Sequence, residues 1–367
     1  MSEVVIVQPY VPAYRVGFFE PLVDRLASIG VNCRVVAGTP DRQQEARGDG
    51  RAGYPWLTRY RPRRLRVWGH SFELGGSIGS WRAADAVILG LEGTSLDVYR
   101  AILRRRTGMR LGLWGHVDNY VSDGSRIDRC LETRQARLSD RIFAYTKSGA
   151  SRAREMGVSA ANISVVMNSM DTAHLSSSMN KYRQMGVSSF RREFGLEESP
   201  VIGYIGGLDK SKRIDFLAAV LDELWVTAPD VRLMVAGRGN QERLLDRSVE
   251  RGQSIRLGYA DDDTVAMIGT LSDAFVMPGR IGLLAVQSLA MGVPILTTEY
   301  PYHAPEKEYL TEGISVFTSK DDRAAYAKLI VQSLGGGKKT IPGAWKYPTV
   351  DGMVSNFAEG VVAMLQN

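Results

Sequence analysis

The stretch MPGRIGLLAVQSLAMGVPILTT, from Met277 to Thr298, predicts a strand end, a turn, an apolar helix over 281–291 and a second strand. The helix begins beside glycines at 279 and 282 and carries one polar side chain, Gln287, on its second turn. A helix N-terminus that receives a phosphate could use both features, because free N–H groups bind anions and glycine admits a close ligand. The alternative is a buried helix whose glutamine bonds a neighbouring carbonyl group.

Strands and helices alternate on both sides of this stretch, which predicts parallel sheets covered on both faces. The expected strands are EVVIVQ, VNCRVVAG, AADAVILG, RLGLWG, DRIFAYT and ISVVMN, then VIGYIG, VRLMVAG, SIRLGY, DAFVMP and VPILTT. The fold class is therefore α/β, with two halves that are each doubly wound. In such sheets ligands bind at the carboxyl ends of the strands.

The length of 367 residues favours two domains. We expect one over 1–180, a second over 181–350, and a C-terminal helix over 351–367 that packs back on the first. The stretch 172–199 is polar and serine-rich at its start, so it is the candidate linker.

The composition excludes several classes of protein. No apolar run reaches the length of a membrane span and no leader precedes the first strand, so we expect a cytoplasmic protein. Cys33 and Cys130 are too few for a disulfide framework, and the four histidines lack metal-ligand spacing. A dinucleotide-binding fingerprint is absent after the first strand, and the second half offers only Gly237-x-Gly239.

The net charge of +6 is uneven along the chain. Residues 1–180 hold 25 Lys and Arg against 17 Asp and Glu, whereas residues 181–367 hold 21 against 23. Arginines cluster at 59–68 and 101–110. An anionic partner such as a membrane surface would explain the clusters, and a solvated basic face is the alternative. No nucleic-acid recognition motif is present, so we expect no nucleic-acid partner.

A second candidate anion site follows the strand that ends at Ile205. Gly206 and Gly207 turn the chain, and Lys212 and Arg213 are expected to open the next helix. Cations oppose the helix dipole at that position, but they suit a bound phosphate. The alternative is an exposed basic first turn.

The second half resembles the donor domain of retaining GT-B glycosyltransferases of the family-four type (glycosyl transferases group 1). The resemblance lies in five stretches and their order along the chain: GGLDKSKRID, VAGRGN, IRLGYA, the opening stretch and HAPEKEYL. Four stretches of the first half support the resemblance: YVPAYRVGFFEPL, LWGHVDN, RIFAYTKSGASRAREMG and ISVVMNSMD. It implies two Rossmann-like domains with a cleft between them, the nucleotide-sugar binding the second and the acceptor the first.

The resemblance also implies roles for individual residues. Lys212 matches a lysine that binds the donor diphosphate and His116 a histidine that faces the donor sugar, so both are the expected catalytic residues. The expected donor-binding residues are Gly207, Lys212, Arg213, Gly237, Tyr259, Ala260, Ile281, Gly282, Leu283, Leu284 and Gln287. Those on the acceptor side are Tyr14, Arg15 and Gly17.

Two positions depart from the family pattern. The residue five before the lysine is usually arginine and here is Gly207, which removes one phosphate ligand that Lys210 or Arg213 could replace. Two glutamates usually lie eight apart around the phosphate-binding helix, and here they are Gly279 and Gln287. Gln287 can still bond a ribose hydroxyl, whereas the change at 279 affects positioning of the sugar.

The expected function is transfer of a sugar, hexosyl-like and with retention, from a nucleotide-sugar to a glycan or lipid-linked acceptor in bacterial cell-surface polysaccharide or glycoconjugate synthesis. No Asp-x-Asp motif of the chain is suited to binding a metal ion, because Asp261–Asp263 fit the N-terminal cap of a helix. We expect no metal and no cofactor. His303 and Glu306 fit loop and cap positions. The protein would be cytoplasmic and peripheral on the inner face of the membrane. The alternatives are a catalytically weakened sugar-nucleotide-binding protein and a GT-B nucleotide-sugar epimerase.

Overall fold

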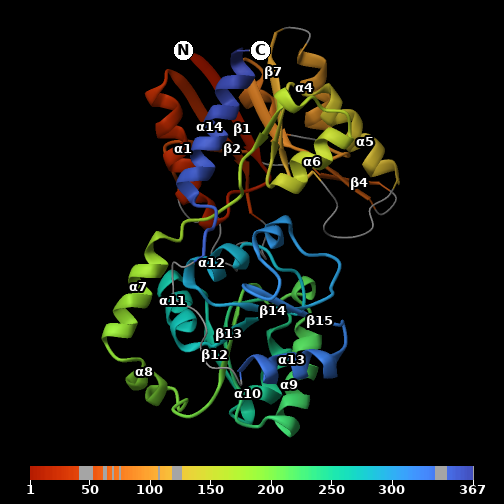
Figure 1. Ribbon diagram of the computed structural model, residues 1–367. Coiled ribbons are helices and arrows are strands. Elements are labelled where there is room, and N and C mark those ends of the chain that lie inside the picture. Colours follow the sequence, from red (N-terminus) through yellow and green to blue (C-terminus); the bar gives the residue numbers. More distant parts are fainter. Residues whose placement is uncertain are drawn as a thin grey trace. The chain divides into compact units, whose positions relative to one another are not determined.

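The computed structural model describes residues 1–40, 53–60, 64–67, 70–73, 76–105, 108–117, 126–334 and 345–366. The chain forms two compact units, Met1–Asp171 with Pro348–Asn367, and Thr172–Tyr347. Each unit is built around a parallel sheet with helices on both faces (Figure 1). The chain therefore enters the second unit earlier than residue 180 and leaves it before the C-terminal helix.

The sheet of the first unit has the strand order β3-β2-β1-β6-β7-β8-β9, and all its pairs are parallel. Its strands are β1 (Ser2–Gln8), β2 (Val31–Gly38), β3 (Leu57–Tyr60), β6 (Ala86–Gly90), β7 (Arg110–Gly115), β8 (Arg141–Ala144) and β9 (Ile163–Val165). The order reverses between β1 and β6, so the topological switch point lies there.

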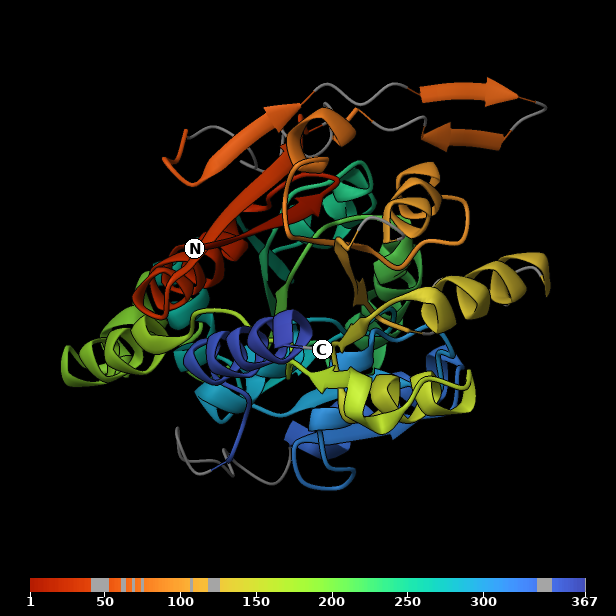
Figure 2. The same cartoon turned by 90° about the horizontal axis from the view of Figure 1, so that it is seen from above.

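The helices of this unit are α1 (Val16–Ser28), α3 (Ile78–Trp81), α4 (Leu96–Arg104), α5 (Arg126–Leu138), α6 (Lys147–Glu155) and α14 (Val350–Gln366). Short 3-10 turns, η1 (Ala13–Arg15) and η3 (Ala160–Asn162), precede α1 and β9. A separate antiparallel pair, β4 (Arg64–Val67) and β5 (His70–Glu73), forms the two orange arrows at the upper right of Figure 2.

Alternate residues of β1 face opposite sides of the sheet, which explains its continuous apolar run. Val4 and Ile6 belong to a core cluster with side chains of α1 and α14, whereas Val5 and Val7 belong to a second cluster with those of α4, α5 and α6. Both faces of the strand are therefore covered.

The C-terminal helix α14 lies beside α1 (Figure 1). The ring of Phe357 on α14 lies 5.5 Å from that of Phe18 and 5.0 Å from that of Trp114, centroid to centroid. Burying a phenylalanine side chain of this kind stabilises a fold by about 1.5–3 kcal/mol. The last helix is therefore part of the core of the first unit.

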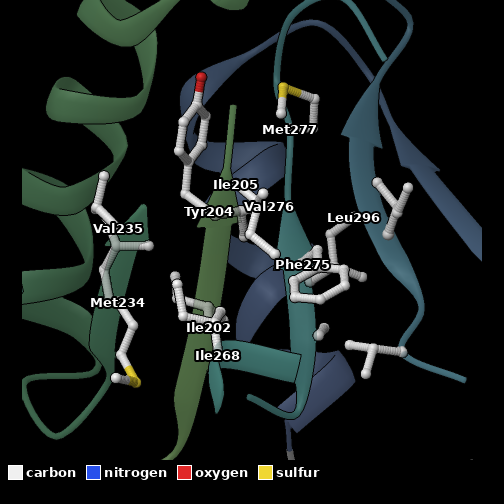
Figure 3. Close-up of a cluster of buried hydrophobic side chains, with 14 of the residues drawn as sticks. Ile202, Tyr204, Ile205, Met234, Val235, Ile268, Phe275, Val276, Met277 and Leu296 are labelled. Atoms are coloured by element: carbon white, nitrogen blue, oxygen red, sulfur yellow. The ribbon is translucent and has the colours of Figure 1, made fainter. Parts of the chain in front are cut away.

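The sheet of the second unit has the order β12-β11-β10-β13-β14-β15, again all parallel. Its strands are β10 (Val201–Ile205), β11 (Arg232–Ala236), β12 (Ser254–Gly258), β13 (Ala274–Val276), β14 (Ile295–Thr298) and β15 (Val316–Ser319). The switch point lies between β10 and β13. Figure 3 shows the core side chains of these two strands and their neighbours, including Ile202 and Phe275.

The helices around this sheet are α7 (Ala173–Gln184), α8 (Val187–Glu193), α9 (Ile214–Thr227), α10 (Asp246–Glu250), α11 (Asp262–Leu271), α12 (Leu284–Met291) and α13 (Arg323–Leu334). The 3-10 turns are η4 (Lys210–Lys212), η5 (Glu242–Leu245) and η6 (Pro305–Tyr309). The expected cap of α11 is confirmed, because the Asp261 carboxylate accepts from the Thr264 N–H group at 2.8 Å.

The prediction that 172–199 is a linker is wrong. This stretch forms α7 and α8, and Leu175 and Met179 of α7 are buried in the core of the second unit. Of the serines that suggested a linker, Ser177 is exposed on α7 and Ser176 and Ser178 are half-buried, so none of the three enters the core and an amphipathic helix tolerates them.

Candidate functional site

Backbone hydrogen bonds donated by two glycines join the carboxyl ends of β10, β11 and β12. The Gly206 N–H group donates to the Ala236 carbonyl at 3.0 Å, and the Gly237 N–H group donates to the Gly258 carbonyl at 2.7 Å. Gly237 has a φ of 153°, and a Cβ there would lie 1.8 Å from the Gly206 oxygen. Only glycine fits at 237, and it brings together the loops expected to bind the donor.

The loops after β10 and β13, on either side of the switch point, are also in direct contact. The Arg280 N–H group donates to the Ser211 carbonyl at 2.9 Å. A Cβ on Gly279 would lie 2.5 Å from the Lys212 carbonyl carbon and 2.6 Å from the Ser211 oxygen. Loop packing therefore requires the glycine at 279 and excludes a carboxylate side chain from that position.

Position 207 differs in this respect from position 279. A Cβ on Gly207 would meet only the Asp209 side chain, at 2.9 Å, and that side chain can move. Tyr204 stabilises this turn: its hydroxyl points towards the strand end where Met277 lies (Figure 3) and donates to the Gly207 carbonyl at 2.8 Å. Burial raises the pKa of Tyr204 well above its ordinary value, so the hydroxyl stays a donor.

Lys212 does not open a long helix, contrary to expectation. It ends the turn η4, Arg213 follows in the left-handed region with φ 56°, and α9 begins at Ile214. Asp209 caps η4 by accepting from the Ser211 N–H group at 2.9 Å. The half-buried Lys212 ammonium donates to the Arg280 carbonyl and therefore lies beside the loop that leads into α12.

Arg213 has partners that indicate a structural role rather than the expected phosphate contact. Its guanidinium pairs with Asp321 and donates to the Pro278 carbonyl at 3.3 Å. The group also stacks on Phe216, 4.2 Å from the ring centroid. These contacts hold a strained backbone position in place and join the loops after β10 and β13.

The N-terminus of α12 offers three N–H groups. Among the described residues, no acceptor takes the N–H groups of Gly282, Leu283 or Leu284. The expectation included a fourth group, that of Ile281, but its N–H donates to His303 Nδ1 at 3.2 Å. Unsatisfied N–H groups at a helix start bind anions such as phosphate.

His303 supports this helix start as a neutral imidazole. Burial, together with the positive charges of Lys307, Lys212 and Arg280, lowers the pKa of His303 to about 4, against the raising effect of a contact with the Thr298 carbonyl. Nδ1 is therefore free of a proton and can accept from Ile281. Three cations lie close enough to affect one histidine, so positive potential accumulates beside α12.

The remaining donor-site candidates lie at the same edge of the sheet. Gln287 is half-buried on α12, and no side-chain hydrogen bond of its amide exists within the described part of the chain. Tyr259, which is 42% exposed, and the partly buried Ala260 follow β12. Contact of these residues with a nucleotide stays a prediction.

In the first unit, His116 follows β7, and its ring centroid lies 4.5 Å from that of Tyr145. Its catalytic role stays a prediction. Tyr14 is 42% exposed at η1. A Cβ on Gly17 would lie 3.2 Å from the Asp171 Cβ, which explains a small residue at this position of α1.

Arg15 is placed differently from the expectation for an acceptor-side residue, because only 5% of it is exposed. Nη2 donates to Asn168 Oδ1 at 2.7 Å and Nη1 to the Met353 sulfur at 3.5 Å. The guanidinium carbon lies 5.3 Å from the centroid of the Trp114 ring and 5.7 Å from that of Tyr145. These contacts assign Arg15 to the packing of α14.

Two contacts that shape the site could not be predicted from the sequence. His303 was expected to be a loop residue, and its bond to Ile281 joins positions 22 residues apart. Asp321, the partner of Arg213, lies 108 residues away along the chain. Over the described ranges, no three side chains of His, Cys, Asp or Glu group together as a metal site would need.

Comparison with known proteins supports the resemblance. Residues 199–335 match the family model described as glycosyl transferases group 1. A glycogen synthase from Mycobacterium tuberculosis is 26% identical over 193 residues, which cover 50% of this chain and 44% of that protein. The chain spans less than half the length of such curated relatives.

Solved structures show the same fold over the whole chain. Anabaena HepE in complex with UDP and glucose has a TM-score of 0.65 at 14% identity and covers 99% of both chains. The UDP-GlcNAc 2-epimerase from Neisseria meningitidis bound to UDP-GlcNAc has a TM-score of 0.61 at 11% identity, covering 98% of this chain and 99% of that one. The fold is GT-B, with two Rossmann-like domains, and the inferred resemblance to group 1 glycosyltransferases is confirmed.

Proposed function

We propose that this protein is a glycosyltransferase that uses a uridine-diphosphate sugar as donor. The sugar would pass, with retention and without a metal or cofactor, to a glycan or lipid-linked acceptor in cell-surface polysaccharide or glycoconjugate synthesis. The matched family segment and the nucleotide complexes of similarly folded proteins support the donor class. The base, the stereochemistry and the acceptor belong to the proposal.

One observation carries the proposal: the Lys212 ammonium and three available N–H groups of α12 occupy the two sides of one switch point. Negative charge develops on the leaving diphosphate as the bond to the anomeric carbon breaks. Donors that are already in place lower the barrier, because they need no reorganisation. The cations around His303 add to the same potential.

A specific observation favours a second candidate, a catalytically weakened nucleotide-sugar-binding protein. Loop packing excludes a side chain at Gly279, where the family usually has a glutamate. Incubation with UDP-glucose and UDP-GlcNAc, followed by NMR of the products, separates the possibilities. Transfer or slow hydrolysis with retained anomeric configuration supports the transferase. Epimerisation without an acceptor supports the epimerase, and binding without turnover supports the weakened protein.

We also propose that the first unit attaches reversibly to anionic lipid. Ile127, Cys130 and Arg134 recur on one face of α5, and Ile127 is 71% exposed. Arg134 is exposed on this face, and Arg129 is exposed on another side of the same helix. Each cation near an anionic leaflet contributes about 1 kcal/mol. In the described ranges, no helix is long and apolar enough to cross a membrane.

The two arginine clusters expected to form this surface contribute less than the sequence suggested. Arg105 and Arg110 of the second cluster pair with Asp140, at 2.5 and 3.6 Å. Most of the first cluster lies outside the described side chains. The helix α5 is therefore the better candidate for the lipid-facing surface.

Cys130 allows a direct test of lipid attachment. It is exposed, whereas Cys33 is buried with its pKa raised to about 12, so a thiol-reactive polarity-sensitive dye should label Cys130. Its emission should shift with phosphatidylglycerol vesicles at low salt and not with phosphatidylcholine. The double variant Arg129→Gln with Arg134→Gln should lose the shift. Equal shifts with both lipids, or none with either, would leave α5 as a solvated face.

The control for this test removes two exposed arginines elsewhere in the first unit. Arg25 on α1 and Arg154 on α6 are exposed. The double variant Arg25→Gln with Arg154→Gln has the same net charge as the α5 variant. It should retain the shift if position rather than net charge determines binding.

A further inference from the structure

The first unit has a pocket at its own switch point, between the carboxyl ends of β1 and β6. It is lined in part by Gln8 at the end of β1, by Gly90 at the end of β6, and by Glu92, Ser95 and Asp97 before and on α4. The pocket is partly open to solvent, and the space within it is about 40 Å³. The proposed donor site uses none of these residues.

Asp97 is fixed in this pocket by a chain of hydrogen bonds. Only 6% of Asp97 is exposed. Its Oδ2 accepts from the Ser77 hydroxyl at 2.5 Å, and the Ser77 oxygen in turn accepts from Trp81 Nε1 at 2.9 Å. Arg100 pairs with Oδ1 at 3.0 Å. A carboxylate has about four acceptor positions, so this one is oriented and still able to accept from a ligand.

The other polar groups of the pocket favour the same kind of ligand. Glu92 brings a second carboxylate, and Ser95 brings a hydroxyl that makes no hydrogen bond within the described residues. No lysine or arginine is among the described residues that line the pocket. A group of hydrogen-bond donors would therefore find acceptors, whereas an anionic group would lie beside two carboxylates, of which Asp97 is paired with Arg100.

The size of the pocket limits the ligand further. A buried water needs roughly 10–15 Å³ measured with a water-sized probe, so about 40 Å³ admits about three groups of that size. This space suits two or three hydroxyl or amino groups on one edge of a sugar ring. The rest of the molecule would remain outside.

We propose that this pocket recognises the acceptor, by binding the hydroxyl- or amine-bearing edge of an uncharged or amino sugar. This assignment rests on the proposed glycosyltransferase function. Its location agrees with the general rule that ligands of open α/β sheets bind at the switch point. It places acceptor recognition at Asp97 and Ser95, away from the buried Arg15.

Gly90 offers a steric test that leaves the fold intact. A Cβ on Gly90 would lie 3.5 Å from Glu92 Oε1, an ordinary contact, so Gly90→Ala adds a methyl group to the pocket without a clash. Gly79→Ala on α3 is the matched control, because nothing lies within 4 Å of a Cβ there. Ser95→Ala removes a hydroxyl that no described residue uses.

Saturation-transfer NMR with glucose, glucosamine and glucuronate, each with UDP present, measures the binding. We expect signals from glucose or glucosamine with the wild type and with Gly79→Ala. Gly90→Ala should weaken binding about tenfold or more, as an extra methyl group does in a small pocket. Ser95→Ala should also weaken binding, and glucuronate should give no signal.

Three results would overturn the pocket assignment: no sugar binds, glucuronate binds as well as glucose, or Gly90→Ala leaves binding unchanged. A separate UDP titration tests the proposed function. If sugars bind as expected and UDP does not, the donor assignment fails while the pocket stands. If UDP binds and the sugars do not, only the pocket assignment fails.

Discussion

Replacing Lys212 with alanine is expected to weaken nucleotide binding and to leave the fold intact. Lys212 is half-buried at the end of a short turn, and its side-chain bond goes to the Arg280 carbonyl. The Asp209 cap and the bond from the Arg280 N–H group to Ser211 do not involve the Lys212 side chain. The two loops should therefore keep their positions in the variant.

The expected magnitude follows from the contact that is lost. A hydrogen bond from an ammonium to a charged group contributes about 1.5–3 kcal/mol, which corresponds to about a 10- to 150-fold rise in Kd. Isothermal titration with UDP at low salt measures this change directly. Because the diphosphate is a charged partner, the wild-type affinity should fall with added salt more steeply than that of Lys212→Ala.

Lys328→Ala is the matched control, because Lys328 is exposed on α13 and alanine favours a helix. It should bind UDP as the wild type does. Circular dichroism and thermal melting should show that Lys212→Ala stays folded. Wild-type affinity in a folded Lys212→Ala variant would refute the phosphate assignment.

Three further predictions concern the same edge of the sheet. In a titration with UDP, Gln287→Ala should bind more weakly than the wild type, whereas Gln287→Glu should keep the wild-type affinity. Weaker binding by Gln287→Glu than by Gln287→Ala would contradict the assignment of Gln287 to the ribose contact. Gly279→Ala should destabilise the second unit by about 1–3 kcal/mol in urea unfolding, because its Cβ would lie 2.5 Å from the Lys212 carbonyl carbon. Gly282→Ala should change stability little, since the nearest atom lies 4.0 Å from its Cβ, and equal costs at both positions would contradict the loop-contact argument. The pKa of His303 is about 4 in the folded protein against an ordinary 6.5. Between these two pH values the unfolded chain therefore binds more protons than the folded protein does. The contribution of His303 to the free energy of unfolding should be fully present above about pH 6.5 and should fall by on the order of 3 kcal/mol towards pH 4. His303→Gln should flatten this part of the stability profile, and an unchanged slope would show that another group titrates.

Periodicity was sufficient for most of the parallel strands. Buried parallel strands are short apolar runs bounded by turns, and helices repeat their apolar residues every three or four positions, so local patterns are distinct. The prediction failed where local polarity and tertiary packing disagree. The stretch 172–199 is serine-rich, yet α7 buries Leu175 and Met179 against the second sheet.

The order of the motifs predicted where the candidate donor site lies, but it did not predict which groups of the site are available to a ligand. A glycine at 279 could leave space either for a ligand or for a neighbouring loop, and the sequence does not distinguish the two. Only the close approach of Ser211 and Lys212 in the structure shows that the space is needed for the loop. In the same way, the sequence is consistent with a phosphate contact of Arg213, and only the structure shows that its guanidinium pairs with Asp321.

The sequence by itself determined the α/β class, the two halves and the positions of the loops at the strand ends, because these depend on residues close together in the chain. Only the tertiary structure decided that the Ile281 N–H group is bonded to His303 and that Arg15 is buried among aromatic rings. Each of these depends on contacts between residues far apart in the chain, and a side chain's role follows from the partners that folding brings to it.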